Sequence, residues 1–139
     1  MRSNATTRRF CAPVQAAASR AKRVLVVEDE WIVARDLNDL LCRLGHAPVG
    51  HAANASDAIR LAAAESPDLI LMDIQLAGSM NGVAVAAEIV RRRVAPIIYI
   101  TANSHVFLNG QAQMVAPYIC IAKPFSEHAV QAAIDSVAV

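Results

Sequence analysis

The chain has 139 residues, a length that suits one domain and leaves no room for a second core. Its residues are 55% hydrophobic but only 4% aromatic, so Ala, Val, Ile and Leu must build the core. The longest apolar runs are far shorter than a membrane span, which excludes a transmembrane helix and predicts a soluble, cytoplasmic protein.

The net charge of +1 is distributed unevenly along the chain. Residues 1–23 hold six basic residues and no acidic one, whereas residues 24–139 hold seven basic and twelve acidic residues. The body therefore lacks the basic face that binding of nucleic acid requires. We predict a basic, disordered N-terminal extension over residues 1–22 and a single folded domain over residues 23–139. An organellar transit peptide is the alternative for the extension, because it is rich in Arg and free of acids.

The first half of the chain alternates strand and helix patterns. A β-branched, apolar run at residues 23–27 predicts a buried strand. Val and Leu at helical spacing predict a helix over residues 33–44, which Gly45 ends. Residues 46–52 predict a weaker strand, and residues 55–65 predict a second helix that Ser66 and Pro67 break.

The alternation continues in the second half. Four apolar residues, 69–72, lead to Asp73 and predict a third strand over residues 68–73. Residues 83–90 then predict a helix and residues 95–101 a fourth strand. Residues 104–113 predict at most a short helix, because Asn109 and Gly110 interrupt it. A fifth strand follows at residues 118–122, and Ser126 caps a last helix.

Strands that alternate with helices in this way predict a parallel sheet with helices on both faces. Right-handed crossovers leave few topologies for such a sheet. We predict an α/β fold of the flavodoxin-like (βα)5 type, a three-layer sandwich whose five parallel strands follow the order 2-1-3-4-5. Its binding crevice would lie at the carboxyl ends of strands 1 and 3.

Polar residues close the predicted strands and would meet at this edge. They are Glu28 and Asp29 after the first strand, Asp73 on the third, Thr101 on the fourth and Lys123 after the fifth. Three neighbouring carboxylates favour a cation, and oxygen ligands without Cys or His select a hard ion such as Mg²⁺. The lysine and the threonine suit an anionic phosphoryl group, with the central carboxylate as its nucleophile.

Four motifs at these strand ends resemble one known family. They are Val-Leu-Val-Val-Glu28-Asp29-Glu30, Leu-Met-Asp73, Ile-Thr101-Ala102 and Ala-Lys123-Pro124-Phe125. With these motifs in this order, residues 23–137 resemble the receiver domain of two-component response regulators. The resemblance implies a phosphoacceptor in a histidine-to-aspartate phosphorelay, a signalling switch rather than a turnover enzyme.

The resemblance also implies a role for each site residue. Asp73 would accept the phosphoryl group, and Thr101 and Lys123 would bind its oxygens. Asp29 would ligate Mg²⁺ directly, Glu28 would support the ion through water, and the backbone carbonyl of Gln75 would complete the metal site together with Asp73. The Lys123–Pro124 peptide bond would be cis.

The implied partners are a sensor histidine kinase or phosphotransfer protein and a downstream protein, with a homodimer left open. Phosphorylation adds a charge of about −2 at neutral pH and would draw the Thr101 hydroxyl inward. The surface of residues 104–113, the fifth strand and the last helix would then change its partners.

Besides the short, glycine-interrupted helix over residues 104–113, two features depart from the family pattern. Cys120 stands three residues before Lys123, where the family usually has an aromatic residue, and the nearest aromatic is Tyr118. The segment from Asp73 to Gly82 is one residue longer than usual and lacks its Pro. This longer segment is similar to that of a subgroup of mostly stand-alone bacterial receivers.

These departures favour an alternative, a non-phosphorylated pseudo-receiver that acts as a protein-binding module. The acids and Lys123 are all present, however, and such modules typically lose one of them. A flavin-binding protein of the same topology is a further alternative, although acids after the first strand would repel a flavin phosphate. The four histidines show no ligand spacing and are predicted to be surface or turn residues, at positions 46, 51, 105 and 128.

Overall fold

Five parallel strands form one sheet in the order β2-β1-β3-β4-β5. The structure is a computed structural model that describes residues 21–76, 81–92, 95–102 and 118–137. Its strands are β1 (Arg23–Val27), β2 (Ala47–Ala52), β3 (Leu69–Asp73), β4 (Ile97–Thr101) and β5 (Tyr118–Ala122). The helices are α1 (Trp31–Arg43), α2 (Ala55–Glu65), α3 (Gly82–Arg92) and α5 (Glu127–Ser136).

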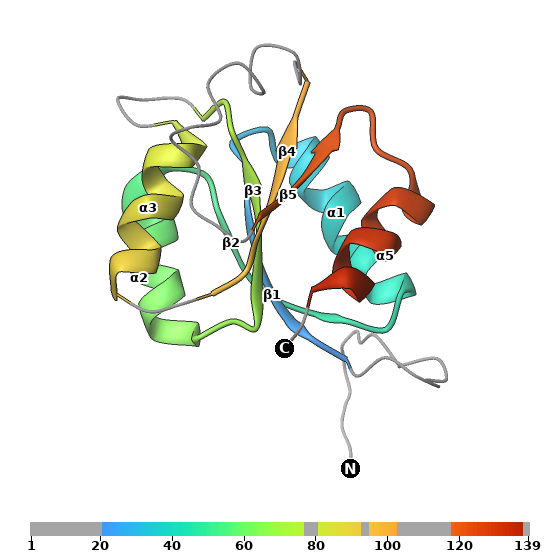
Figure 1. Ribbon diagram of the computed structural model, residues 1–139, viewed down its shortest axis with the longest axis horizontal. Helices are drawn as coiled ribbons and strands as arrows, with labels where there is room; N and C mark the ends of the chain where they lie inside the picture. Colours follow the sequence, from blue (N-terminus) through green and yellow to red (C-terminus); the bar gives the residue numbers. More distant parts are fainter. Residues whose placement is uncertain (1–20, 77–80, 93–94, 103–117, 138–139) are drawn as a thin grey trace.

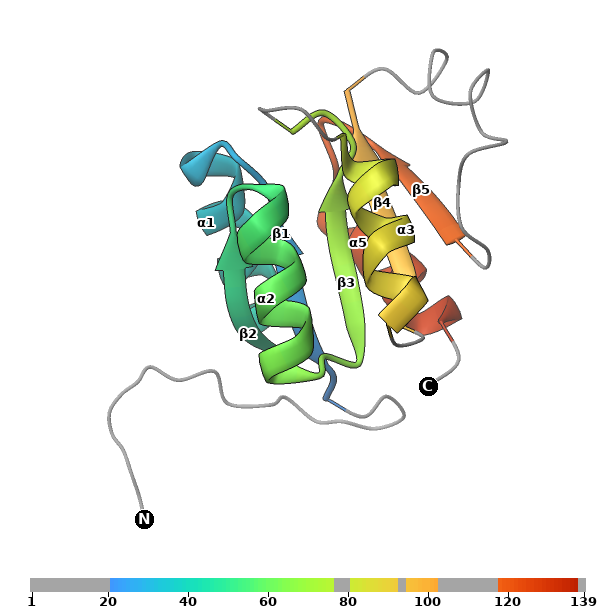
Figure 2. The same cartoon turned by 90° about the vertical axis from the view of Figure 1, so that its left-hand side faces the viewer.

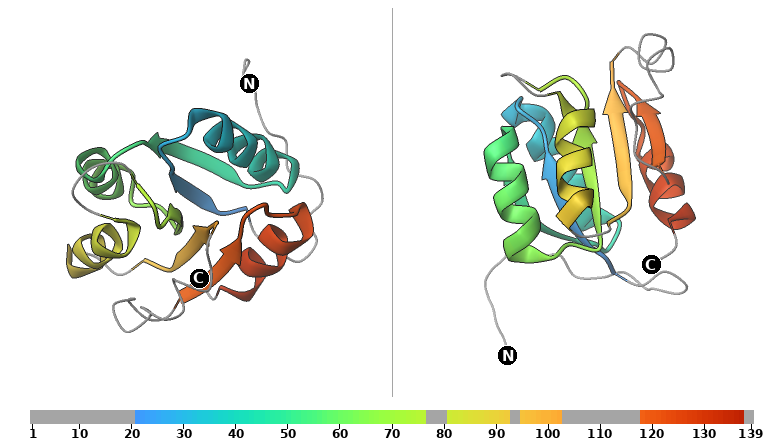
Figure 3. Two further views of the ribbon diagram at one scale, coloured as in Figure 1. Left: turned by 90° about the horizontal axis from the view of Figure 1, so that it is seen from above. Right: turned by 60° about the vertical axis from the view of Figure 1, so that its left-hand side comes forward.

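The helices cover the sheet in two layers (Figure 1). One apolar cluster joins alternate strand residues such as Leu25, Ile70 and Tyr99 to α2 and α3, which face the viewer in Figure 2. A second cluster joins the other strand residues, such as Val26 and Leu71, to α1 and α5. Seen from above in Figure 3, these two pairs of helices lie on opposite sides of the sheet. The predicted three-layer sandwich and its strand order are confirmed.

Local sequence signals set most of the element ends. β3 and β4 are buried along their whole length, as continuous apolar runs predict for central parallel strands. Gly45 follows α1 with a φ of 87°, a value that glycine adopts without strain. The Ser126 hydroxyl accepts a hydrogen bond from the Ala129 N–H at 3.0 Å and caps α5 as predicted.

The ends of the helices and strands differ by at most two residues from those predicted from the sequence. β2 begins at Ala47, β3 at Leu69 and β4 at Ile97. The short helix predicted at residues 104–113 and the extension at residues 1–20 lie outside the described residues. Within the part of the chain that is described, no helix is long and apolar enough to cross a membrane.

His46 corrects a sequence prediction, because it is buried with 2% of its surface exposed rather than a surface residue. It lies between α1 and β2, and its Nδ1 accepts a hydrogen bond from the Lys22 N–H at 3.0 Å. The proton of the neutral ring is therefore on Nε2, which has no hydrogen-bond partner among the described residues. No local pattern predicts this contact, because its two residues are 24 positions apart in the chain.

We expect His46 to make the stability of the fold depend on pH. Burial, and next the charge of Lys22, lower the pKa of His46 below 6.5, against the opposing charge of Asp135. As the pH falls, His46 is therefore protonated in the unfolded chain before it is protonated in the folded one. The contribution of neutral His46 to the free energy of unfolding is complete above pH 6.5 and is lost as the pH falls through the folded pKa.

His46→Asn keeps an acceptor for the Lys22 N–H but cannot titrate. Urea unfolding from neutral to mildly acidic pH should show the free energy of unfolding falling more steeply in the wild type than in this variant. The strand-end acids titrate alike in both proteins, so the difference between the two curves isolates His46. Parallel curves would contradict the assignment.

Candidate phosphoryl-acceptor and cation site

The sheet register brings the strand-end residues to one edge. Val27 pairs with Met72, so Glu28 and Asp73 follow next to one another at the ends of β1 and β3. Thr101 pairs with Ala122 at the ends of β4 and β5, and its carbonyl accepts a hydrogen bond from the Lys123 N–H at 2.8 Å. All the predicted carboxylates and the lysine therefore lie at the carboxyl edge of the sheet.

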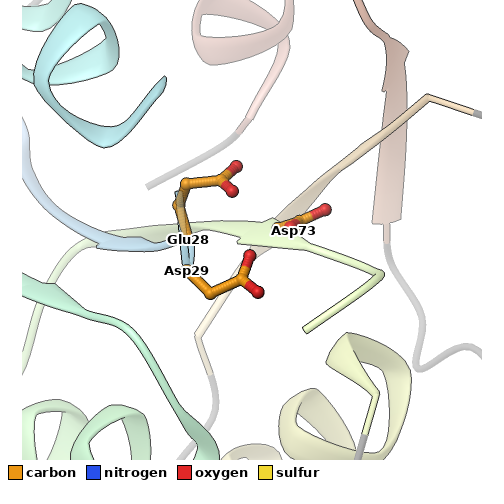
Figure 4. A group of neighbouring side chains, drawn as sticks. All are labelled: Glu28, Asp29 and Asp73. Carbon is orange, nitrogen blue, oxygen red and sulfur yellow. The ribbon is translucent and has the colours of Figure 1, made fainter. Parts of the chain in front are cut away.

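Three carboxylates form the centre of this edge. Single oxygen atoms of Glu28, Asp29 and Asp73 all lie within 4.8 Å of one another. Figure 4 shows the Glu28 and Asp29 side chains extending from the end of β1 on the side where Asp73 lies. Glu28 is 1% exposed and Asp73 4%, so two of the three carboxylates have little access to water.

Lys123 supplies the cation that faces these acids. Its Nζ lies 3.1 Å from Glu28 Oε1 and 3.6 Å from Asp73 Oδ1, and its side chain is 18% exposed. Burial opposes the charge of the ammonium group, but the hydrogen bond to Glu28 and the charge of Asp73 raise the pKa of Lys123. The Lys123–Pro124 bond that precedes α5 is cis, as the family resemblance implies.

One ammonium group does not balance the acids. Burial raises the pKa of Glu28 to about 7, against the hydrogen bond from the Glu30 N–H, and the charge of Asp73 adds to the rise. Burial also raises the pKa of Asp73, although Lys123 and the Gln75 N–H oppose it. The cluster therefore carries more negative charge than its own residues stabilise, which is the condition in which a carboxylate site favours a cation.

A profile of the response regulator receiver domain matches residues 24–135, most of the chain. The chain belongs to the response regulator receiver family. The family predicted from the sequence is thus confirmed. The four receiver motifs end at the same edge of the sheet as the acidic cluster.

Several curated regulators are similar in sequence to this chain. The chain is 38% identical to the phyllosphere-induced regulator PhyR of Methylorubrum extorquens over 86% of the chain and 44% of that protein. It is 36% identical to the transcriptional regulatory protein PdtaR of Mycobacterium tuberculosis over 78% of the chain and 53% of that protein. It thus spans about half the length of both relatives, whereas it covers 97% of the chemotaxis protein CheY of Thermotoga maritima at 30% identity.

Solved structures give the same family. The receiver superposes on the solution structure of the PhyR receiver domain from Erythrobacter litoralis with a TM-score of 0.72 and 35% identity, covering 83% of the chain and 88% of that domain. For the anti-anti-sigma factor PhyR of Bartonella quintana the TM-score is 0.74 at 33% identity, over 84% of the chain and 47% of that protein.

Two backbone N–H groups, those of Gln75 and Gly82, make contacts at the end of β3. The Gln75 N–H donates to Asp73 Oδ1 at 3.2 Å and holds the carboxylate in place. The Gly82 N–H donates to the Ile74 carbonyl at 2.7 Å and joins the start of α3 to the end of β3. A Cβ on Gly82 would lie 2.1 Å from the Asp73 carbonyl oxygen, so only glycine fits there.

The other predicted residues are found as follows. Thr101 is 1% exposed at the end of β4, and Gln75 is exposed two residues after Asp73. Cys120 has a free, half-buried thiol that packs with the α2/α3 cluster, and its strand position pairs with Tyr99. Burial raises the pKa of that thiol.

Sequence reasoning missed one residue at this edge. His51, near the end of β2, is exposed as predicted, but its Nε2 lies 2.7 Å from the Glu28 carbonyl oxygen. The one available signal was its position near the end of β2, the strand that neighbours β1.

Proposed function

We propose that this chain is a phosphoacceptor receiver in which Asp73 takes a phosphoryl group from a histidine kinase or phosphotransfer protein. The observation that supports this role most directly is the Lys123 ammonium group, which contacts Asp73 and Glu28 at once in a nearly buried acidic cluster. A fixed cation beside a carboxylate nucleophile matches the charge that develops when a phosphoryl group is transferred.

The donor set fits a divalent cation such as Mg²⁺. Among the described residues, the group that converges here consists of three carboxylates and includes no His or Cys. The backbone carbonyl of Gln75 is the further ligand that the family implies. Asp29 and Asp73 would bind the ion directly and Glu28 through water. When bound, the ion would neutralise the acids and the oxygens of the incoming phosphoryl group.

The chain's own residues would carry the transfer itself. A carboxylate oxygen of Asp73 attacks phosphorus while the bond to the donor's leaving group breaks, which gives an aspartyl phosphate. Lys123 is already 3.6 Å from that carboxylate and would pair with a phosphoryl oxygen, and the Thr101 hydroxyl would donate to another. The Gln75 N–H keeps the attacking group oriented through its contact with Oδ1.

The output of such a receiver would be a protein contact rather than turnover of a substrate, and we place it in the cytoplasm. The proposed surface comprises residues 104–113, β5 and α5, the first of which lies outside the described residues. Between β5 and α5 lies a groove of about 530 Å³ with a mainly apolar lining that includes Ile119, Phe125 and Ala129. The related PhyR of Bartonella quintana is described as an anti-anti-sigma factor, which supports a protein as the downstream partner.

The reaction can be tested with acetyl phosphate and Mg²⁺, read by intact mass. The wild type should gain one phosphoryl group, and Asp73→Asn should gain none because its amide is not a nucleophile. Asp68→Asn is the matched control, because it makes the same change at the opposite end of β3, away from the acidic cluster. There Asp68 accepts a hydrogen bond from the Arg23 N–H at 2.8 Å. An adduct on Asp73→Asn would overturn the assignment.

The second candidate is a binding module that keeps the receiver fold without the reaction. Cys120 favours it, because a small half-buried thiol stands where receivers usually carry the aromatic residue of the switch. Absence of an adduct on the wild type, together with a Trp31 fluorescence that does not respond to Mg²⁺, would select this second function.

A further inference from the structure

Two residues at the end of β2 contact the backbone of Glu28, the first residue after β1. The Glu28 N–H donates to the Ala52 carbonyl at 2.9 Å, and the Glu28 carbonyl oxygen lies 2.7 Å from His51 Nε2. A carbonyl oxygen can only accept, so Nε2 carries the proton and the imidazole donates. The residue that leads from β1 into the acidic cluster is therefore fixed by two hydrogen bonds from the neighbouring strand.

The contact with His51 bears directly on Asp29. The Glu28 carbonyl belongs to the planar peptide unit that also contains the Asp29 nitrogen and Cα. Fixing the direction of this oxygen fixes the plane, and with it the positions of the Asp29 nitrogen and Cα from which the side chain extends. The Glu30 N–H, which donates to Glu28 Oε2 at 3.1 Å, depends on the same turn.

We propose that His51 is a positioning residue of the cation site: its Nε2–H holds the Glu28–Asp29 peptide in the orientation that gathers the three carboxylates. It acts through this peptide and does not itself touch the ion. This inference rests on the proposed function, because it presumes that the acids bind Mg²⁺. Residues that orient metal ligands from behind typically contribute 10- to 100-fold to metal affinity.

The test compares the wild type with His51→Ala and His51→Gln. The glutamine amide places an N–H donor near the position of Nε2, whereas alanine offers none. Metal-free protein is titrated with Mg²⁺, and binding is followed by calorimetry and by the fluorescence of Trp31, which is 65% exposed and lies two residues after Asp29. Because His51 is itself exposed, we expect the lower end of the range, a Kd about tenfold weaker for His51→Ala. His51→Gln should recover most of the loss.

A second readout separates positioning from a simple effect on the fold. At saturating Mg²⁺ the rate of phosphorylation by acetyl phosphate should be the same in all three proteins, while the Mg²⁺ concentration for half-maximal rate rises in His51→Ala. A purely structural role would instead lower the thermal midpoint in the presence of a chelator and leave the Mg²⁺ affinity unchanged.

The possible failures are distinguishable. Wild-type protein that binds no Mg²⁺ would overturn the proposed function and this inference with it. Wild-type protein that binds Mg²⁺ with the same Kd as His51→Ala would overturn the inference alone. A His51→Gln variant as weak as His51→Ala would likewise overturn the role of the hydrogen bond.

Discussion

Methionine in place of Lys123 is expected to slow phosphoryl transfer to Asp73 by about 100-fold or more. The substitution keeps the length of the side chain and removes the charge that lies 3.6 Å from Asp73 and 3.1 Å from Glu28. No other Lys or Arg in the described residues makes an ion pair with either of these acids. The measurement is the initial rate of adduct formation with acetyl phosphate at saturating Mg²⁺. A rate close to that of the wild type would contradict the role of Lys123.

The same variant should also be less stable without metal. It leaves Glu28 and Asp73 nearly buried and close together with no cation between them, which costs on the order of 3 kcal/mol when both are ionised. Urea unfolding at mildly alkaline pH should show this loss, and mildly acidic pH or added Mg²⁺ should reduce it. Lys123→Arg is the control: it keeps the charge and should restore stability, but its planar group should restore transfer only in part.

Alanine in place of Gly82 is expected to destabilise the fold by about 3 kcal/mol, the upper range for overpacking. The new Cβ would meet the Asp73 carbonyl oxygen at 2.1 Å and the Ile74 Cα at 2.8 Å. Both are backbone atoms at the end of β3, next to the Asp73 carboxylate, so no side-chain rotation can relieve the clash. Either α3 or the end of β3 must move, and a shift of β3 would displace the Asp73 carboxylate. We therefore expect Mg²⁺ binding and phosphorylation to fall together with stability.

Gly50→Ala provides a matched control within the same chain. A Cβ at this β2 position would lie 3.5 Å from side-chain atoms of Leu25 and Leu61, which is ordinary van der Waals contact. Urea unfolding of this variant should differ from the wild type by less than about 1 kcal/mol. Equal stabilities for Gly82→Ala and Gly50→Ala would show that the approach of Gly82 to β3 is not restrictive.

The fold was readable because its signals are local. Continuous apolar runs mark strands buried on both faces, and Gly45 and Ser126 mark the ends of helices by their backbone and hydrogen-bonding preferences. Once the strand order was known, residues directly after each strand had to share an edge. Asp73 and Lys123 could therefore be assigned to one site from positions 50 residues apart in the sequence.

The contacts of His46 and His51 were not readable in this way. Both involve a side chain on or beside β2 and a backbone group of a residue next to β1, and the register between these strands shifts between Val24 and Leu25. A sequence pattern predicts which residues of a strand face each side of the sheet, but it does not predict a shift in register. The shift decides which residue lies opposite each position of the neighbouring strand. The close approach of Gly82 to the Asp73 and Ile74 backbone is likewise a tertiary contact that no local pattern predicts.

The contact between Lys22 and α5 has a practical consequence for attaching the protein to a surface or a probe. Lys22 Nζ donates to the Ile134 carbonyl at 3.1 Å, so the chain enters β1 beside the last turn of α5. This junction lies at the amino edge of the sheet, and the acidic cluster lies at the carboxyl edge. Both segments therefore lie at the pole of the molecule opposite the acidic cluster. A surface or probe attached at this pole would leave the acidic cluster open to the solution.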